Sequence, residues 1–300
     1  MTSLPFNISR IHSMPFKHLL SIFMLITAVL ANPVHAEQNR LISTDSGVTE
    51  LIFALGLEED LIAVDVTSTL PDDFPELPNI GYHRRLSAEG LMSMEPTTVI
   101  GSQHMGPEPV INALKQAKVN LVQLPSAKTK EQLRDNILNL ATALNKQERG
   151  SALLKTVDNQ LAKLEQTNLS GEKVAFVLSM DDNKLRLAGK QTGGHSFIEL
   201  MAADNVADFD NYRNVSAESL LAMQPTAIIV AGRDAETAVE KLMKANPILA
   251  HTPAGKRDTI VAVDGSSLVA GLSVSAIQEA IRLSKAIHNS TNTERQLNKK

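Results

Sequence analysis

Short apolar runs alternate along the chain with segments in which apolar residues recur every three or four positions. The runs are typical of buried strands, and the spaced segments are typical of amphipathic helices. Strands are predicted at residues 41–43, 61–64, 97–100, 120–124, 174–178, 185–188, 226–230 and 259–263. Helices are predicted at residues 48–55, 87–94, 108–117, 195–201, 216–223 and 275–288. This alternation predicts an α/β fold with parallel sheets.

One segment of the chain occurs twice. Residues 86–100 read LSAEGLMSMEPTTVI and residues 215–229 read VSAESLLAMQPTAII, and 8 of the 15 aligned positions are identical. The copies lie 129 residues apart, which is too far for the repeat of a solenoid. Each copy follows a tyrosine, Tyr82 or Tyr212, and the chain has no other tyrosine. The repeat therefore predicts two similar lobes with a ligand cleft between them.

The region between the two copies has the spacing of two amphipathic helices. Leu133, Ile137, Leu140 and Leu144 lie on one face of the first, and the second begins near Gly150 and would be about 20 residues long. A helical connector is stiffer than a coil, so we expect only limited hinge motion between the lobes. We expect a N-terminal lobe at 37–145, an interlobe helix at 146–170, a C-terminal lobe at 171–290 and a disordered polar tail at 291–300.

The N-terminus has the features of a secretory signal peptide. Arg10 and Lys17 precede and flank an apolar run from Leu19 to Ala31, and Val34-His35-Ala36 provides a small-residue cleavage site. The run is shorter than the about 20 residues that a membrane span needs, so we expect residues 1–36 to be removed. No cysteine follows the run, which argues against a lipid anchor.

Composition excludes several classes of partner. Removal of residues 1–36 changes the net charge from −4 to −6, and the chain has no basic run beyond Arg84-Arg85, so we expect no nucleic-acid partner. The chain has no cysteine, but the 264 residues after position 36 are enough to bury cores without disulfides. We expect a soluble monomer in the periplasm.

The sequence contains no motif of the common enzyme classes. A cysteine nucleophile, GxSxG, HExxH, a P-loop and GxGxxG are all absent. No two histidines after residue 36 have the i, i+4 spacing of a helical metal clamp. These histidines are His83, His104, His195, His251 and His288. The sequence therefore favours a binding protein over a metal-ion binder, and an enzyme stays open as an alternative.

Asn79 to Pro96, NIGYHRRLSAEGLMSMEP, resembles a segment of the periplasmic haemin-binding proteins of bacterial haem ABC importers, which are class III substrate-binding proteins. In that family a Gly-Tyr pair, a basic residue and Leu-Ser-(Ala/Ser)-Glu-Gly form the most specific stretch. Residues 43–56, 61–69, 188–190, 212–225 and 260–272 are similar to their counterparts there. The resemblance implies two Rossmann-like lobes joined by a long helix.

The same resemblance implies a ligand and partners. The ligand is haem b (haemin) as transported cargo, delivered to an ABC permease dimer in the inner membrane, with an outer-membrane haem receptor as the indirect supplier. A binder of a siderophore or of cobalamin is the alternative within the same class, and the short spacing from Gly81-Tyr82 to the Ser-Ala-Glu segment argues against it. A haem-modifying enzyme is the alternative from a different class.

By the resemblance, Tyr82 matches the family's axial ligand to haem iron. Fe(III) is a hard acid that suits an anionic oxygen, and tyrosinate is a known axial ligand of haem. A free phenol has a pKa of about 10, so the phenolate needs help from the metal and from a nearby cation. Arg84 matches the basic position two residues on and is expected to supply that help. The alternative is a packed loop tyrosine with solvated arginines.

Three further residues are candidates for the cleft or for a second ligand. His83 stands where the family has a bulky apolar residue; in an extended segment it would face away from Tyr82, as a structural or surface residue. His195 follows Gly193-Gly194 at the start of a helix and is a candidate second axial ligand, a contact to a second haem, or a partly exposed residue near a helix N-terminus. Tyr212 is a candidate for the opposite wall of the cleft or for core packing.

Glu89 and Glu218 occupy equal positions in the two copies of the repeat. By the resemblance they match the pair with which such proteins dock on arginines of the permease dimer, although both would also favour the N-terminus of a helix. Weaker candidates for the wall of the cleft are Met180, Gln103, His104 and residues 268–272, with Lys190, Arg213 or Arg233 near the propionates.

Overall fold

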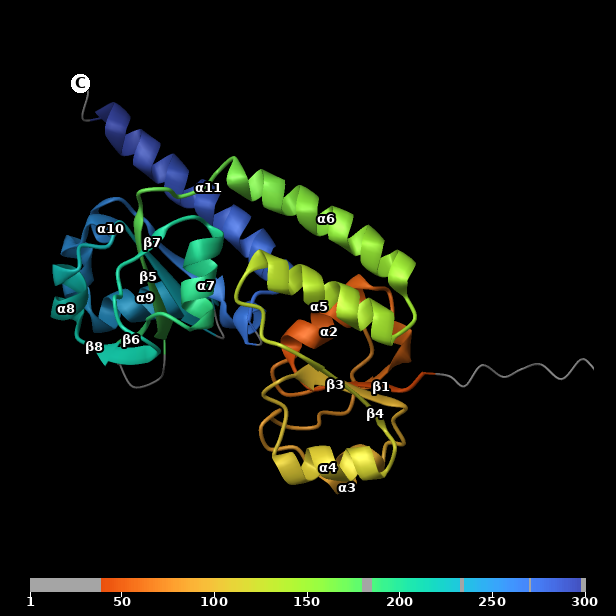
Figure 1. Ribbon diagram of the computed structural model, residues 1–300. Coiled ribbons are helices and arrows are strands. Elements are labelled where there is room, and N and C mark those ends of the chain that lie inside the picture. Colours follow the sequence, from red (N-terminus) through yellow and green to blue (C-terminus); the bar gives the residue numbers. More distant parts are fainter. Residues whose placement is uncertain (1–38, 180–184, 233–234, 270, 298–300) are drawn as a thin grey trace, which may run out of the picture. The chain divides into compact units, whose positions relative to one another are not determined.

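The computed structural model describes residues 39–179, 185–232, 235–269 and 271–297 (Figure 1). The chain divides into two units, residues 1–38 and 39–300, and all of the described residues belong to the second. The expected signal peptide, together with Met180 and Arg233, lies outside the described residues.

The N-terminal lobe is built on a parallel sheet of four strands in the order β2-β1-β3-β4. The strands are β1 (Leu41–Ser43), β2 (Leu61–Ala63), β3 (Thr98–Ser102) and β4 (Asn120–Leu124). The central strand β3 is buried along its whole length, as expected for a parallel sheet covered on both faces. The helices are α2 (Ser46–Ala54), α3 (Ala88–Met92) and α4 (Glu108–Gln116), and η1 (Glu58–Asp60) is a short 3-10 turn.

The C-terminal lobe has a six-stranded sheet that is mixed. Its path is β10 (Ile260–Asp264), β9 (Ala227–Gly232), β5 (Lys173–Ser179), β6 (Leu185–Ala188) and β8 (Tyr212–Val215), and β7 (Asp204–Asn205) pairs with β5. Strand β6 runs antiparallel to both β5 and β8, so the expectation of parallel sheets is wrong for this edge. Only residues 180–184 separate β5 from β6, which is too short for the crossover that parallel strands need.

Within the described residues, the C-terminal lobe contains four helical elements that the apolar spacing did not predict. These are α9 (Ala235–Ala245), the one-turn helix α10 (Pro253–Lys256) and the 3-10 turns η2 (Pro247–His251) and η3 (Gly265–Leu268). The predicted helices are α7 (Gly193–Leu200), α8 (Ala217–Ala222) and α11 (Val274–Leu297). Helix α11 runs to Leu297, so the expected disordered tail from residue 291 is helical over most of its length. Residues 289–297 contain neither glycine nor proline, so nothing in the backbone stops the helix there.

Two helices connect the sheets, α5 (Lys130–Ala143) and α6 (Gln147–Glu165). Helix α6 packs against both α5 and α11 (Figure 1). The largest apolar core belongs to both lobes, because it includes Ile52 of α2, Val157 of α6, Phe176 of β5 and Ile277 of α11. Burying each such side chain is worth about 1.5–3 kcal/mol, so a shared core resists separation of the lobes.

The two-lobed α/β fold predicted from the repeat is confirmed. Among the described residues, no helix combines the length and the apolar character that a membrane span requires.

Candidate functional site

The carboxyl ends of the N-terminal strands carry two buried aspartates. Asp45 follows β1 and caps α2, where one carboxylate oxygen accepts from Val48 N at 3.0 Å and the other from Ser102 N, at the end of β3, at 2.6 Å. Burial raises the pKa of Asp45, and these two hydrogen bonds oppose the rise. Gly101 makes this junction possible, because a Cβ on it would overlap the side chain of Thr44.

Asp65 follows β2 and is fully buried, at 0% exposed. It accepts hydrogen bonds from the Thr67 hydroxyl at 2.8 Å and from the Ser68 amide and hydroxyl at 3.1 and 2.8 Å. Its negative charge contributes to the raised pKa of Asp45. The two carboxylates therefore lie close together at one edge of the sheet, where parallel strands place functional side chains.

The loop that carries Tyr82 is joined to the end of β2 by main-chain hydrogen bonds. Ile80 N donates to Val64 O at 2.9 Å, and Val66 N donates to Gly81 O at 3.0 Å. Gly81 has a φ of +83°, a conformation that favours glycine, and it directs the chain into the turn that follows. Tyr82 is 42% exposed, and its hydroxyl has no hydrogen-bond partner among the described residues.

His83 lies under Tyr82 and is only 3% exposed. Its Nδ1 atom is 3.6 Å from Asp65 Oδ2, and its ring centroid is 4.2 Å from that of Tyr82 at an interplanar angle of 48°. The expectation of an extended segment is wrong, because Arg85 N donates to Tyr82 O at 2.7 Å and closes a turn. Tyr82 is exposed and His83 is buried, as expected if adjacent side chains face opposite ways, but the turn brings their two rings into contact.

Arg84 and His104 are exposed, and the charge of Arg84 acts on His104. Burial, then the charges of Arg84 and His83, lower the pKa of His104, while Asp45 opposes the change. A histidine that prefers its neutral form beside an arginine can donate or accept a hydrogen bond, or bind a metal through nitrogen. No group of three or more histidine, aspartate or glutamate side chains within the described ranges is placed to hold a metal ion.

Tyr212 on β8 is placed differently from Tyr82. Its hydroxyl accepts from Gly194 N at 3.4 Å, at the start of α7, and Arg186 lies 5.4 Å from its ring centroid. Burial raises the pKa of Tyr212, and the hydrogen bonds from Gly194 and Thr192 oppose the rise. The ring packs against the shared core, which is the packing alternative considered for this residue.

His195 lies in the first turn of α7, with both ring nitrogens near side chains of its own lobe. Nδ1 is 3.1 Å from Asn205 Nδ2, and Nε2 is 3.4 Å from Glu199 Oε1. Asn205 also donates to Ala188 O at 3.0 Å, so the amide that faces the imidazole is itself held in place. The structure thus provides His195 with partners that an iron atom would have to displace.

Glu89 and Glu218 occupy matching exposed positions in the first turns of α3 and α8. Each helix is capped by the serine two residues earlier in the repeat: Ser87 accepts from Gly90 N at 3.2 Å, and Ser216 accepts from Ser219 N at 3.1 Å. The backbone amide of Glu218 itself and the hydroxyl of Ser216 lower the pKa of Glu218. Both carboxylates are therefore exposed charges at the start of a serine-capped helix, in similar surroundings.

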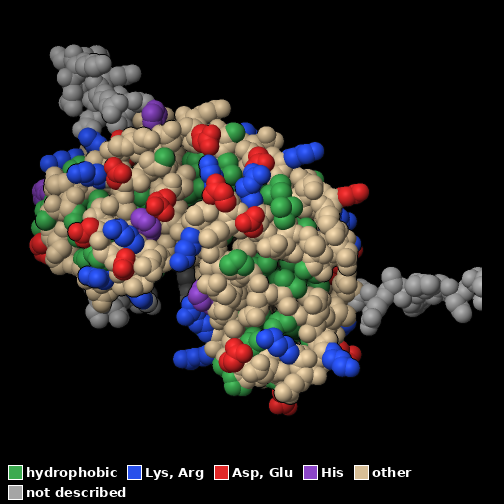
Figure 2. Space-filling view, viewed as in Figure 1, with side chains coloured by type: hydrophobic (Ala, Val, Ile, Leu, Met, Phe, Trp, Pro, Cys, Tyr) green, Lys and Arg blue, Asp and Glu red, His purple; other side chains and the backbone are tan. Residues whose placement is uncertain are grey.

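The surface is hollowed between the two lobes, and lysine and arginine side chains gather along the edges of the hollow (Figure 2). Of the candidates for propionate contact, Lys190 and Arg213 are exposed, and the Arg213 guanidinium lies 4.7 Å from the centroid of the Phe209 ring. Of the candidate segment 268–272, residue 270 lies outside the described residues, and Leu272 adjoins the N-terminal lobe, since its N donates to Ala127 O at 2.7 Å.

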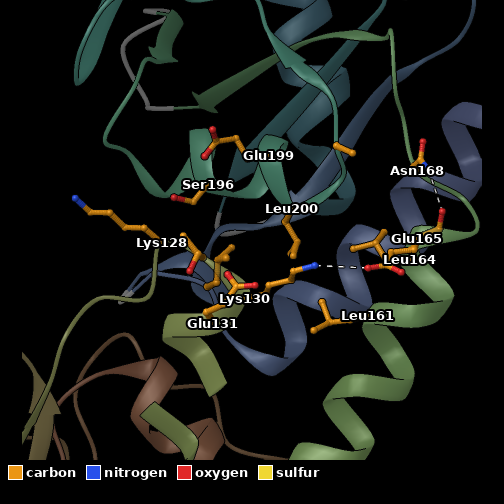
Figure 3. Close-up of a pocket in the computed structure, with 13 residues that line it drawn as sticks. Lys128, Lys130, Glu131, Leu161, Leu164, Glu165, Asn168, Ser196, Glu199 and Leu200 are labelled. Atoms are coloured by element: carbon orange, nitrogen blue, oxygen red, sulfur yellow. Dashed lines mark hydrogen bonds and ion pairs between the residues drawn. The ribbon is translucent and has the colours of Figure 1, made fainter. Parts of the chain in front are cut away.

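A separate cavity of about 320 Å³ lies among α5, α6 and α7 (Figure 3). Leu161, Leu164 and Leu200 form its apolar wall, and Lys130, paired with Glu165 at 3.5 Å, lies at its rim. Of the cleft candidates that the sequence singled out, Leu272 lines this cavity. The chemistry-bearing side chains lie instead at the carboxyl edge of the first sheet.

Sequence reasoning missed Asp45 and Asp65. Each lies two residues after the end of a short strand, and carboxylates at that position meet at one edge of a parallel sheet. That pattern was the available signal for both.

The structure consists of two α/β lobes that share an apolar core, with polar side chains at the edge of one sheet. This arrangement is that of two-lobed binding proteins. Residues 41–266 match the model of the family described as periplasmic binding protein. The chain belongs to this family, which is one of substrate-binding proteins.

Solved structures and curated relatives show which proteins this chain is similar to. The periplasmic haem-binding protein HutB of Vibrio cholerae is 37% identical with a TM-score of 0.77, over 84% of this chain and 99% of that one. A periplasmic haem-binding protein from Pseudomonas aeruginosa is 32% identical with a TM-score of 0.73, over 84% and 93%. The vitamin B12-binding protein of Pectobacterium carotovorum is 24% identical over 209 residues, which cover 68% of this chain and 75% of that protein.

Proposed function

We propose that this protein binds haem in the periplasm and delivers it to an ABC permease of the inner membrane. Two solved structures that are 37% and 32% identical to this chain are of periplasmic haem-binding proteins, whereas the B12-binding relative is 24% identical. The haem is cargo, so the site must bind it and also let it go.

The observation that carries the proposal is the free hydroxyl of Tyr82. It is exposed at the edge of the first sheet and has no partner in the described part of the chain, so nothing has to be displaced for it to reach iron. A tyrosinate oxygen is a hard donor that suits Fe(III). Arg84 is exposed and lies two residues after Tyr82, so its positive charge can offset negative charge on the phenolate or on a haem propionate.

Delivery is assigned to Glu89 and Glu218. Paired carboxylates at matching positions of two similar lobes suit a partner with two-fold symmetry, and exposed charges favour orientation and on-rate. Under this proposal, residues 1–36 export the protein, which works as a monomer, and an outer-membrane haem receptor supplies the haem indirectly.

The test is a titration of purified residues 37–300 with haemin, monitored by absorption and by electron paramagnetic resonance. We expect a Soret band and the features of high-spin ferric iron bound by tyrosinate, with loss of those features in Tyr82→Ala. The absence of any spectral change with wild-type protein would refute haem binding. Cyanocobalamin and a ferric siderophore serve as competitor ligands, and tighter binding of either would support that alternative.

The same titration gives the number of haems bound per chain. A ratio of one with wild-type protein and with His195→Ala would remove the second-haem role considered for His195, and an unchanged spectrum of His195→Ala would remove the second-ligand role. Formation of an open-chain product would instead indicate an enzyme.

A further inference from the structure

Three side chains contact one another in sequence beneath the exposed phenol: Asp65, His83 and Tyr82. The Asp65 carboxylate is fully buried, His83 is 3% exposed, and Tyr82 is 42% exposed. The series therefore leads from the interior of the lobe to the surface, with the phenol at its outer end.

The inner end of this series is rigidly held. Asp65 accepts two hydrogen bonds from hydroxyls, of Thr67 and Ser68, and one from the Ser68 amide. Four acceptor directions are available on a carboxylate, so capacity remains on the side that faces His83. Conformational freedom is small for a fully buried group with three donors around it.

His83 is held by both its side chain and its main chain. Its Nδ1 atom is buried, forms no hydrogen bond within the described residues and is 3.6 Å from Asp65 Oδ2. Its carbonyl accepts from Gly106 N at 2.9 Å, and Gly106 O in turn accepts from Leu86 N at 2.9 Å. These contacts tie His83 to the loop before α4 on one side and to the end of β2 on the other.

Tyr82 has no comparable restraint. Its hydroxyl has no partner among the described residues, and its ring contact is with His83, at 4.2 Å between centroids. The direction in which the phenol points therefore depends on the imidazole beneath it.

We propose that His83 is a positioning residue for Tyr82, held in its own orientation by Asp65. The imidazole contacts the ring of Tyr82 and fixes the direction of the phenol, so that the oxygen meets the iron without first losing rotational freedom. We assign His83 no bond to the iron, because its side chain is 3% exposed and its Nδ1 atom faces Asp65 in the interior of the lobe. This inference rests on the proposed function of Tyr82 as the haem ligand.

The first experiment uses the protein without haem. The chain has two tyrosines and no tryptophan, so in Tyr212→Phe all tyrosine fluorescence comes from Tyr82. We expect its anisotropy to decay with the tumbling of the whole protein. Adding His83→Ala should introduce a fast component from free motion of the ring, and His251→Ala, which removes an exposed histidine of the other lobe, should not.

The Tyr212→Phe variant alone can give a result that overturns the proposal. A dominant fast component in Tyr212→Phe with His83 intact would mean that the imidazole does not hold the ring. This measurement needs no His83 variant, so it decides the question even if His83→Ala fails to fold.

The second experiment measures haem dissociation from loaded protein into a haem-scavenging apoprotein. We expect about a tenfold faster release from His83→Ala, equivalent to the loss of roughly 1.4 kcal/mol at 25 °C, and a smaller increase from Asp65→Asn. The double variant should release haem no faster than His83→Ala, because Asp65 acts through His83. Full additivity would overturn the proposed order of contacts.

Spectra of the loaded variants separate positioning from ligation. The tyrosinate features should persist in His83→Ala; loss of a nitrogen ligand in that variant would overturn the proposal by making His83 a ligand. Haem binding by wild-type protein with unchanged release from His83→Ala and Asp65→Asn would overturn only the positioning role. Failure of wild-type protein to bind haemin would overturn the proposed function itself.

Discussion

Tyr82 and Tyr212 precede the two copies of the same fifteen-residue segment, but their hydroxyl groups have opposite surroundings. The Tyr82 hydroxyl is free within the described residues, and its ring rests on a buried histidine. The Tyr212 hydroxyl accepts from Gly194 N in the first turn of α7, and its ring packs against the core near Arg186. The two tyrosines that precede the repeat therefore differ: Tyr212 is bonded and packed within its lobe, whereas the Tyr82 hydroxyl is free within the described residues.

The difference arises from the elements that carry them, a strand for Tyr212 and a turn for Tyr82. Tyr212 lies in β8, an antiparallel edge strand beside β6, and this places its ring over the start of α7. Tyr82 lies in a turn after a loop that pairs only briefly with β2. A strand holds its side chains against neighbours, whereas a turn can leave one exposed.

The sharpest test of this comparison exchanges each tyrosine for phenylalanine. Tyr82→Phe should weaken haem binding by about 100-fold or more, roughly 2.7 kcal/mol, because the iron loses its oxygen ligand. Tyr212→Phe should leave haem affinity nearly unchanged and lower the free energy of unfolding by about 1 kcal/mol, the usual value of one hydrogen bond. Haemin titration and urea unfolding measure the two effects. Equal losses of affinity would end the distinction between the lobes.

The glutamates should behave as equals where the tyrosines do not. In proteoliposomes that contain the cognate permease, Glu89→Gln and Glu218→Gln should each reduce haem uptake, and the double variant should reduce it by about tenfold or more. Haem affinity should not change, because both carboxylates are exposed in the first turns of their helices. A loss confined to one variant would show that docking is not symmetric.

Substitutions at two glycines, one in each lobe, test the difference in packing between the lobes. A Cβ on Gly194 would lie 2.5 Å from Phe176 Cδ1 and 2.7 Å from Ala188 Cβ, so Gly194→Ala should cost about 1–3 kcal/mol of unfolding free energy and displace the amide that meets Tyr212. A Cβ on Gly90 would lie 3.5 Å from Ser87 Cβ, an ordinary contact. Gly90→Ser, which copies the second lobe, should therefore be nearly neutral. Thermal unfolding of the two variants checks both expectations.

A smaller effect is expected at His195. Its ring nitrogens lie near Asn205 and Glu199, so His195→Ala should cost about 1 kcal/mol of stability while the tyrosinate spectrum of the haem-loaded protein persists. His195→Gln is the control that keeps a polar group at this position. Loss of a low-spin, nitrogen-ligated signal in His195→Ala would instead establish it as a second ligand.

The pH dependence of stability should distinguish the tyrosines most subtly. Burial raises the pKa of Tyr212 above its ordinary value of 10.0, so the folded state retains the phenolic proton where the unfolded state loses it. Stability from this group is present below pH 10 and declines as the pH rises from there toward the raised pKa. Urea unfolding at pH 8 and above pH 10 should show a decline in wild-type protein that is reduced in Tyr212→Phe. An identical decline in both proteins would contradict the assigned shift.

Much of the fold was predictable because its signals are local. The apolar runs, the serine caps of the two repeat helices and the spacing of α5 and α6 depend on residues close in sequence, and they predicted those elements near their observed bounds. The mixed sheet was missed because strand direction depends on how short a connection is, not on the strand's own residues. Helix α9 was missed because it carries few buried apolar residues, Ala238 and Leu242.

The sequence by itself determined the duplication, the two lobes, the family resemblance and the choice of Tyr82, since each rests on residue identity and spacing. Only the tertiary structure decided what surrounds each tyrosine. It brought Asp65, from the end of β2, to His83 beneath Tyr82, and it closed the start of α7 over Tyr212. The physical reason is that burial and partner choice depend on chain segments distant in sequence, and a local pattern contains no information about which of them will meet.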